Sequence, residues 1–497
     1  MPYSLESLIG GAPAPTRVTP ADVRAARGSG ARPLVVLDDD PTGTQSVSDL
    51  PVLVSWSADD LEWALATGAG GVYVMTNSRS LSPADAEARN REVVRAALEA
   101  ARRVGVDVDV VSRGDSTLRG HVPLEPDTVI DELAAAGVGV DGVLLVPAFG
   151  AAGRVTVDSV HHLRNADGDY SPVGESEFAR DATFGYRSSD LAEWLEEKSG
   201  GRIAADSVVR LTLDTVRGST EDLADLLADV TGWRYVVADA VEESDLSALA
   251  LGLLAAEGRG RRFVCRVGPP FPRALLGHDV REPLTAAEVD DLRGSGRGSP
   301  SPQTGGLVVV GSHVALTTRQ LDVLHARRSP ATVELEVERV LGDDASQHLD
   351  EVVGATAAAL ADGDVVLGTS RDLVRGTDPD DSLRIARQVS DAVAAVVARL
   401  LERATPRFVV AKGGITSSDV AARGLGMRRA VVRGPMLPGL VSLWEPVDGP
   451  GRGVPYVVFA GNVGDDGSLA EVVAPLSTPS YRRGVRGWGP GPPRRRP

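Results

Sequence analysis

The chain has 497 residues, 42% of them hydrophobic and 24% charged, which is the composition of a globular protein with two or three domains rather than of a disordered chain. Its formal net charge of −17 argues against a nucleic-acid or anionic-membrane partner, because such binding relies on Lys and Arg. Cys265 is the single cysteine, and no signal peptide or spanning apolar run is evident, so we expect no disulfide, no cysteine-built metal site and a cytoplasmic location.

In the first part of the chain, short apolar runs alternate with stretches of helical length. Residues 1–30 are rich in Gly, Pro, Ala and Arg without a clear period, and we predict a flexible tail there. The alternation that follows is typical of an α/β protein whose parallel strands are buried on both faces. The expected strands are 33–40, 70–78, 107–115, 142–149, 235–241 and 262–267, and the expected helices include 83–103 and 221–230.

A segment dominated by Gly, Ser and Pro, within residues 286–306, predicts a linker that we place at 291–305. A second α/β series follows, with strands expected at 306–313, 332–337, 364–370, 407–414 and 456–465 and helices at 314–328, 346–361 and 382–404. Residues 481–497 are basic and are predicted to be a flexible tail. We therefore predict two different α/β lobes, 31–290 and 306–480, with mainly parallel sheets and the active site in the cleft between them.

Polar residues concentrate just after the expected strands of the first lobe, where open α/β sheets bind ligands. "LDDDPTGT" ends one strand with Asp38, Asp39 and Asp40, and "TNSRS", "SRGDSTLRGH" and "PAFGAAGR" follow others. Arginines offer paired donors to carboxylates or phosphates, while Asp, Ser and Thr suit hydroxyl groups. The mixture predicts a site for a small polyhydroxy acid. The alternative for each residue taken singly is a helix cap or turn.

The second lobe has three glycine-rich turns after strands, "VGSHVALTTRQ", "AKGGITSSDVA" and "AGNVGDDGSL". Glycine lets backbone N–H groups approach a phosphate, and a following helix adds a favourable dipole. Together the turns predict a nucleotide cradle, although each turn taken alone fits a structural helix cap better. Neither a Walker A loop nor a GxGxxG fingerprint is present.

A competing interpretation starts from Asp38, Asp40 and Thr42, which satisfy the "DxDxT" motif of haloacid-dehalogenase-like phosphatases. In that family the first Asp is the nucleophile and the second the general acid/base. "NVGDDGSL" and Lys412 resemble the later motifs of the same family. These motifs lie across the expected linker from the first one, and the hypothesis leaves "SRGDSTLRGH" and the glycine turns unexplained.

Taken in order, the acidic, arginine-rich and glycine-rich motifs between about residue 33 and residue 470 resemble those of the four-carbon acid sugar kinase family. The family includes threonate, erythronate and 3-oxo-tetronate kinases. The resemblance implies an N-terminal lobe that binds the sugar acid and a C-terminal lobe that binds ATP. It further implies transfer of the γ-phosphoryl group to the terminal hydroxyl, with ATP and Mg²⁺ as cofactors. The metal ligands stay unknown, and both a monomer and a homodimer stay open.

The resemblance also carries site residues onto this sequence. On the sugar-acid side they are Asp39, Arg79, Arg113, Gly114, Asp115 and Ser116. On the ATP side they are Ser312, Gly413, Gly414, Ile415, Thr416 and Gly461. The sequence departs from the expected pattern at His121, at the "TQ" of residues 44–45 and over residues 264–277. These departures leave the particular acid open.

For the mechanism, we expect Arg79 and Arg113 to hold the carboxylate, and Asp115 and Ser116 to hold the hydroxyl groups. Asp39 is the first candidate for the general base, and Asp115 is the second. Asp38 is expected to point away from Asp39 across the strand. One of the three aspartates is expected to bind the turn amides of Thr42 and Gly43. A non-catalytic sugar-acid-binding homologue is a further alternative.

Overall fold

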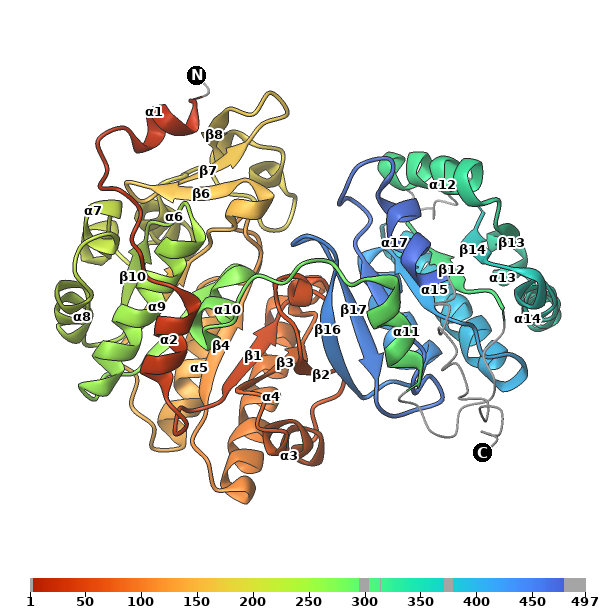
Figure 1. Cartoon of the computed structure of the whole chain (residues 1–497), viewed down its shortest axis with the longest axis horizontal. Coiled ribbons are helices and arrows are strands. Elements are labelled where there is room, and N and C mark those ends of the chain that lie inside the picture. The colour runs from red at the N-terminus through yellow and green to blue at the C-terminus, as the bar shows by residue number, and fades with distance from the viewer. Residues whose placement is uncertain (1–2, 295–303, 313, 371–378, 478–497) are drawn as a thin grey trace, which may run out of the picture.

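The computed structural model describes residues 3–294, 304–312, 314–370 and 379–477. Two lobes lie side by side, and their strands join into one fifteen-stranded sheet flanked by helices (Figure 1). The strand order is β13-β14-β12-β15-β18-β17-β16-β2-β3-β1-β4-β11-β5-β10-β9. The predicted α/β class with two lobes and mainly parallel strands is confirmed. The continuity of the sheet from one lobe to the other was not predicted.

The N-terminal lobe has eight parallel strands in this sheet, whose Val- and Leu-rich runs are buried between two layers of helices. The strands are β1 (Leu34–Asp38), β2 (Leu50–Leu53), β3 (Gly71–Met75), β4 (Asp109–Arg113), β5 (Gly142–Val146), β9 (Val209–Leu211), β10 (Arg234–Ala238) and β11 (Phe263–Val267). The helices are α3 (Ala58–Ala66), α4 (Pro83–Val104), α5 (Leu124–Ala135), α6 (Leu191–Lys198), α7 (Leu213–Val216), α8 (Thr220–Ala228), α9 (Glu243–Gly258) and α10 (Pro270–Leu276).

Local signals explain where a typical helix of this lobe begins and ends. The Ser82 side chain accepts a hydrogen bond from the Asp85 amide at the start of α4, and Pro83 occupies the first helical position. The helix ends at Gly105, whose φ of 77° is in the left-handed region. The helices predicted at 83–103 and 221–230 are present as α4 and α8.

A small antiparallel sheet beside the N-terminal lobe was missed by the sequence analysis. It consists of β6 (Arg154–Val157), β7 (Val160–Arg164) and β8 (Tyr170–Pro172). Its strands have only 3 to 5 residues, too few for an apolar period to stand out. This sheet places Arg154 and His161 near the ends of the main strands.

The C-terminal lobe repeats the layered arrangement with strands β12 (Leu307–Val310), β13 (Ala331–Leu335), β14 (Val365–Thr369), β15 (Val409–Lys412), β16 (Arg429–Leu437), β17 (Val441–Pro446) and β18 (Tyr456–Phe459). Its helices are α11 (Ala286–Gly294), α12 (Ala315–Arg328), α13 (Val337–Val340), α14 (Ala345–Asp362), α15 (Pro379–Arg403), α16 (Gly414–Asp419) and α17 (Ser468–Ser477). All five strands predicted for this lobe are present. Helix α11 packs against α17, with Val289 fully buried in the core of this lobe, so the predicted boundary at residue 290 falls inside a helix of the C-terminal lobe.

The antiparallel hairpin β16–β17 joins the two lobes and was also missed. β16 pairs with β2 of the N-terminal lobe from Arg429↔Leu53 to Val432↔Leu50. Gly434 and Pro435 interrupt the strand pattern of β16, and the register shifts around them. Across this junction the buried Asp60 binds Arg428 at 2.8 Å and Arg429 at 2.8 Å. The two lobes are therefore connected by a strand pair and by two ion pairs of the buried Asp60.

The prediction of a flexible tail over residues 1–30 is wrong for its described part. Helices α1 (Leu5–Ile9) and α2 (Pro20–Arg27) form there, and Val23 is fully buried in the core of the N-terminal lobe. α2 was overlooked because it has only eight residues and Val23 is its only large apolar side chain. The predicted tail at 481–497 and residues 295–303 of the predicted linker lie outside the described residues. Within the described ranges, no helix combines the length and apolarity that a bilayer-spanning segment needs.

Candidate active site

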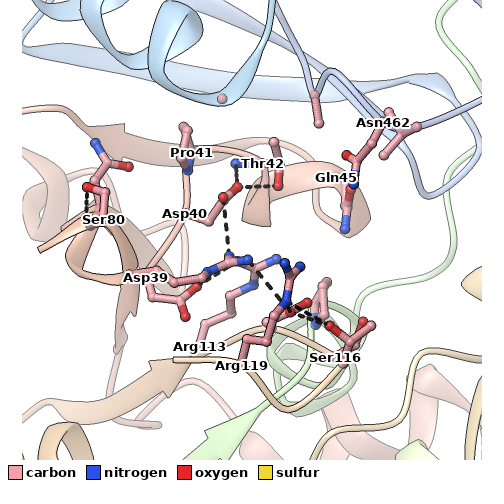
Figure 2. A pocket seen from close by; sticks show the side chains of 18 of the residues that line it. Asp39, Asp40, Pro41, Thr42, Gln45, Ser80, Arg113, Ser116, Arg119 and Asn462 are labelled. Atoms are coloured by element: carbon pink, nitrogen blue, oxygen red, sulfur yellow. Dashed lines mark hydrogen bonds and ion pairs between the residues drawn. The ribbon is translucent and has the colours of Figure 1, made fainter. Parts of the chain in front are cut away.

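A cavity of about 620 Å³ lies between the lobes, where the carboxyl ends of the strands meet (Figure 2). Both lobes contribute to its wall. The N-terminal lobe provides Asp39, Asp40, Pro41, Thr42, Gln45, Asn77, Arg79, Ser80, Arg89, Arg113, Asp115, Ser116, Thr117, Arg119, Phe149, Arg154, Phe178 and Pro269. The C-terminal lobe provides Gly414, Ser418, Asp419, Leu440, Ala460, Gly461, Asn462 and Val463. The cavity thus joins the two groups of motifs that the sequence analysis singled out.

Asp39 lies just past the end of β1 and is surrounded by guanidinium groups. Its Oδ1 accepts a hydrogen bond from Arg79 at 2.9 Å and lies 3.3 Å from Arg113 Nη1, while its Oδ2 lies 3.6 Å from Arg266 Nη2. Burial raises the pKa of Asp39, and the charges of Arg79, Arg266 and Arg113 act against that rise. Oδ2 has no hydrogen-bond partner among the described residues. Asp39 therefore has an acceptor oxygen to spare.

Asp38 and Asp40 have different tasks from Asp39. The fully buried Asp38 binds Arg113 Nη1 at 2.7 Å and packs against Gly43, and burial raises its pKa to about 7. Asp40 accepts hydrogen bonds from the Thr42 amide, at 2.9 Å, and from the Thr42 hydroxyl. Asp40 is therefore the aspartate that binds the turn amide of Thr42, as was expected of one of the three. The expectation that Asp38 and Asp39 point apart is wrong, because Asp39 follows the strand end and both meet the same guanidinium.

The loop that follows β4 supplies Asp115 and Ser116 to the cavity. Asp115 is bound by the Thr117 hydroxyl and by Arg119 Nε, the latter at 2.7 Å. Although burial opposes it, the charges of Arg79 and Arg119 hold the pKa of Asp115 well below its usual range. The carboxylate of Asp115 is therefore ionised and accepts hydrogen bonds from Thr117 and Arg119.

His161 and Tyr186 support this loop from behind, and no sequence signal marked either of them. Burial lowers the pKa of His161 to about 4, so the ring is neutral. Its Nδ1 lies 2.9 Å from the Thr156 hydroxyl and its Nε2 lies 2.8 Å from the Ser116 carbonyl, which assigns the ring proton to Nε2. The Tyr186 hydroxyl donates to the Thr117 carbonyl at 2.7 Å. Both side chains fix the course of the loop.

Gly114 does not line the cavity, and its role is to make room for Arg266. A Cβ on Gly114 would lie 2.2 Å from Arg266 Nη2. Arg266 comes from the 264–277 segment and donates to Ser112 Oγ at 2.9 Å and to Glu125 Oε2 at 2.5 Å. The 264–277 segment therefore brings a third guanidinium beside Asp39.

Replacing Gly114 by Ala is expected to destabilise the protein by about 1–3 kcal/mol, because the added methyl group must displace Arg266 from its partners. Urea unfolding measures the loss. Gly139→Ala is the matched control, since nothing lies within 4 Å of its added Cβ. Equal unfolding midpoints for the two variants would show that Arg266 adjusts freely.

The glycine turns of the C-terminal lobe meet at the other side of the cavity. Gly414 and Gly461 line it, Gly413 and Thr416 flank Gly414 in its turn without lining it, and Ser312 lies in the turn after β12. Ile415, the remaining residue of the predicted ATP side, follows Gly414 in α16. A Cβ on Gly461 would lie 2.6 Å from Ser312 Oγ, and Gly413 has a φ of 127° that disfavours other residues. The Thr416 hydroxyl lies where a Cβ of Gly311 would be, at 2.2 Å. Three loops thus converge so tightly that a larger residue is disfavoured at Gly311, Gly413 and Gly461, and such glycine-rich turns suit a phosphate cradle.

Lys412 lies directly before Gly413 and is fully buried. Its Nζ donates to the Ala460 carbonyl at 2.7 Å and lies 3.7 Å from the centre of the Phe459 ring. Burial lowers its pKa to about 7. Lys412 ties the Gly413 turn to the Gly461 turn and does not line the cavity.

Several lining residues were not predicted as site residues. Arg154 and Asn77 occur in strand-end motifs that the sequence analysis quoted, so a signal for them existed. Asn77 Nδ2 donates to Ser418 Oγ at 2.6 Å and thereby links the lobes at the cavity. Phe149 and Phe178 come from irregular segments where no period marks a functional side chain.

Comparison with known proteins agrees with this division of the chain. Residues 34–275 match the family model described as a sugar-binding N-terminal domain, and residues 307–469 match the one described as a nucleotide-binding C-terminal domain. The matches define a protein with one sugar-binding and one nucleotide-binding domain. The chain belongs to the four-carbon acid sugar kinase family.

Two curated relatives are D-threonate kinases. The protein from Salmonella typhimurium is 25% identical over 459 residues, which cover 88% of this chain and 97% of the relative. The protein from Cupriavidus necator is 27% identical over 434 residues, covering 83% of this chain and 87% of the relative. Identities at this level leave the particular substrate of this chain open.

Two solved structures share the fold. A Haemophilus influenzae protein superposes with a TM-score of 0.57 at 17% identity, covering 89% of this chain and 99% of that protein. A Salmonella typhimurium protein titled as a tRNA synthase has a TM-score of 0.61 at 19% identity, covering 88% and 98%. These likenesses support the two-lobed fold alone.

Proposed function

We propose that the protein is an ATP-dependent kinase that phosphorylates the terminal hydroxyl of a four-carbon sugar acid such as threonate, erythronate or a 3-oxo-tetronate. The observation that carries this proposal is the shared cavity. The strand-end Asp and Arg side chains of the sugar-binding domain face the glycine turns of the nucleotide-binding domain across it. Phosphoryl transfer requires such a meeting of acceptor and nucleotide.

Within this cavity, Asp39 accepts the proton of the attacking hydroxyl. Its Oδ2 accepts no hydrogen bond from the described residues and lies 3.6 Å from Arg266 Nη2, and burial raises its pKa, so it is a stronger base than an exposed carboxylate. Asp115, the second candidate, is weaker because Thr117 and Arg119 both donate to its Oδ2 and its pKa is lowered. Ser116 and Asp115 are placed to bind the hydroxyl groups of the substrate.

The residues of the C-terminal lobe fit the phosphates of ATP. The turns at Ser312, Gly413 and Gly461 pack closely against one another, and Gly414 and Gly461 expose backbone without a side chain to the cavity. Bound Mg²⁺ would neutralise charge on the phosphate oxygens. In the described part of the chain no three Asp, Glu, His or Cys side chains form a metal site of their own. Asp40, which is ionised and lines the cavity, would therefore hold Mg²⁺ together with phosphate and water.

The phosphatase alternative fits the geometry poorly. It needs Asp38 as a nucleophile, but Asp38 is fully buried, bound to Arg113 and absent from the cavity wall. It also assigns no role to the converging glycine turns. A non-catalytic sugar-acid-binding homologue would have no use for the spare acceptor oxygen of Asp39.

The test is an ATP-consumption screen of the purified protein with Mg²⁺ against D- and L-threonate, D- and L-erythronate and the 3-oxo-tetronates. We expect ADP release that depends on one of these acids, with a monophosphorylated product by mass spectrometry. Phosphate release from sugar phosphates without nucleotide would favour the phosphatase. Binding of an acid without ADP release in any combination would favour the non-catalytic homologue.

A further inference from the structure

Five arginines line the cavity, and one of them differs from the rest in its partners. The five are Arg79, Arg89, Arg113, Arg119 and Arg154. The first four are engaged by the protein itself: Arg79 by Asp39 and Asp40, Arg89 by the Thr76 carbonyl and the Trp56 ring, Arg113 by Asp38 and Asp39, and Arg119 by Asp115. The Arg154 side chain has no ion pair or hydrogen bond to any residue that the structure describes, and its Nε is buried.

The backbone of Arg154 is held firmly. Its amide donates to the Phe149 carbonyl at 3.0 Å, and its carbonyl accepts from the Phe149 amide at 2.8 Å. On the other side it pairs with Leu163 in the small antiparallel sheet. The position from which the side chain extends is therefore fixed by the backbone.

The Arg154 guanidinium lies near other positive charges and has no carboxylate paired with it among the described residues. Burial lowers its pKa, Asp115 acts against this, and Arg119 and Arg164 lower the pKa further. Asp115 is itself shared by Arg119 and Thr117 and makes no contact with Arg154. A partly desolvated cation without a partner is costly, and a bound carboxylate would remove that cost through paired hydrogen bonds.

Arg154 also lies in a useful place relative to Asp39. Arg154 begins β6 of the small sheet and Asp39 follows β1 of the main sheet, and both residues line the same cavity. Arg113 and Arg79, by contrast, contact Asp39 directly. An anion on Arg154 would leave the opposite end of a short substrate free to reach Asp39.

We propose that Arg154 binds the carboxylate of the substrate and selects acids over neutral sugars, an inference that rests on the proposed kinase function. The role that the sequence analysis gave to Arg79 and Arg113 passes to Arg154. Arg79 and Arg113 instead hold and tune Asp39. With the carboxylate on Arg154, the terminal hydroxyl faces Asp39 and the glycine turns.

The experiment compares Arg154→Met, Arg154→Lys and the control Arg164→Met with the wild-type protein. Arg164 is an exposed neighbour with the same charge that does not line the cavity. For the preferred acid, we expect Arg154→Met to raise KM about 10- to 100-fold, with kcat changed only slightly. Arg154→Lys should recover part of that loss, since it keeps the charge without the paired donors. Arg164→Met should leave KM unchanged.

Two further measurements separate the possible failures. With the four-carbon polyol that has CH₂OH in place of the carboxylate, the weak kcat/KM should be equal in wild type and Arg154→Met. Unchanged KM for the acid in an active Arg154→Met variant would overturn the inference and leave the kinase proposal intact. If the wild type consumes no ATP with any acid, the kinase proposal fails. In that case, calorimetric titration of wild type and Arg154→Met with the same acids tests the role of Arg154 separately. Equal affinities of the two proteins for the acid, or no binding by either, would overturn the inference.

Discussion

Asp39→Asn is expected to lower kcat about 100- to 10,000-fold, because the amide cannot accept the proton of the attacking hydroxyl. Asn has nearly the same shape as Asp, so ATP affinity should stay close to that of the wild type. Steady-state kinetics with the acid identified by the screen measures the first effect, and titration with a nucleotide analogue measures the second.

Asp38→Asn is the matched control for this prediction. The substitution removes a carboxylate at the same strand end, and that carboxylate also pairs with Arg113. Unlike Asp39, however, Asp38 does not line the cavity. We expect kcat of this control to fall far less than that of Asp39→Asn. Equal losses would mean that the balance of charges around Arg113, and not proton acceptance by Asp39, limits the reaction.

The pH dependence of the wild type offers a second view of Asp39. The group must be ionised to accept a proton, and its pKa is raised above 3.8 by burial. As the pH falls through that raised pKa, kcat/KM should decrease. An activity that persists unchanged down to the ordinary range of an exposed aspartate would contradict the role of Asp39.

Arg113→Met is expected to destabilise the protein by about 3–5 kcal/mol, because it leaves the buried carboxylate of Asp38 without its cation and removes one of the cations around Asp39. The Arg113 side chain is 3% exposed, and its partners Asp38 and Asp39 are 0% and 2% exposed. Urea unfolding measures the free energy of unfolding. Arg399→Met, which breaks a surface pair with Asp350 at 39% and 56% exposure, is the control and should cost about 0–1 kcal/mol.

The deficit of Arg113→Met should shrink as the pH is lowered from about 8 to about 5. Burial already raises the pKa of Asp38 to about 7 in the wild type, and loss of Arg113 raises it further. A folded-state pKa above the unfolded one means that the folded state takes up protons as the pH falls, which stabilises it. A deficit that is constant over this range would show that lost packing, and not buried charge, causes the destabilisation.

The sequence by itself determined the elements and their class. Runs such as "LVVLD" and "FVCRV" are apolar on both faces, so they predicted buried parallel strands, and the structure confirms every strand predicted in both lobes. Because the carboxyl ends of parallel strands meet at one edge, the residues that follow them converge without further information. Asp39, Arg79, Arg113, Asp115 and Ser116 therefore reach one cavity, as the sequence analysis expected.

The tertiary structure decided how the charges of the site are distributed. No pattern along the chain says that Arg79 and Arg113 are occupied by aspartates while Arg154 stays unpaired, because those partners come from different strands. Nor does it show that Asp38 is inaccessible or that Gly114 makes room for Arg266. The joining of the lobes through β2 and β16 depends on a pairing between segments far apart in sequence. Local patterns fix buried faces and strand ends, whereas partners in space depend on packing that only the folded chain defines.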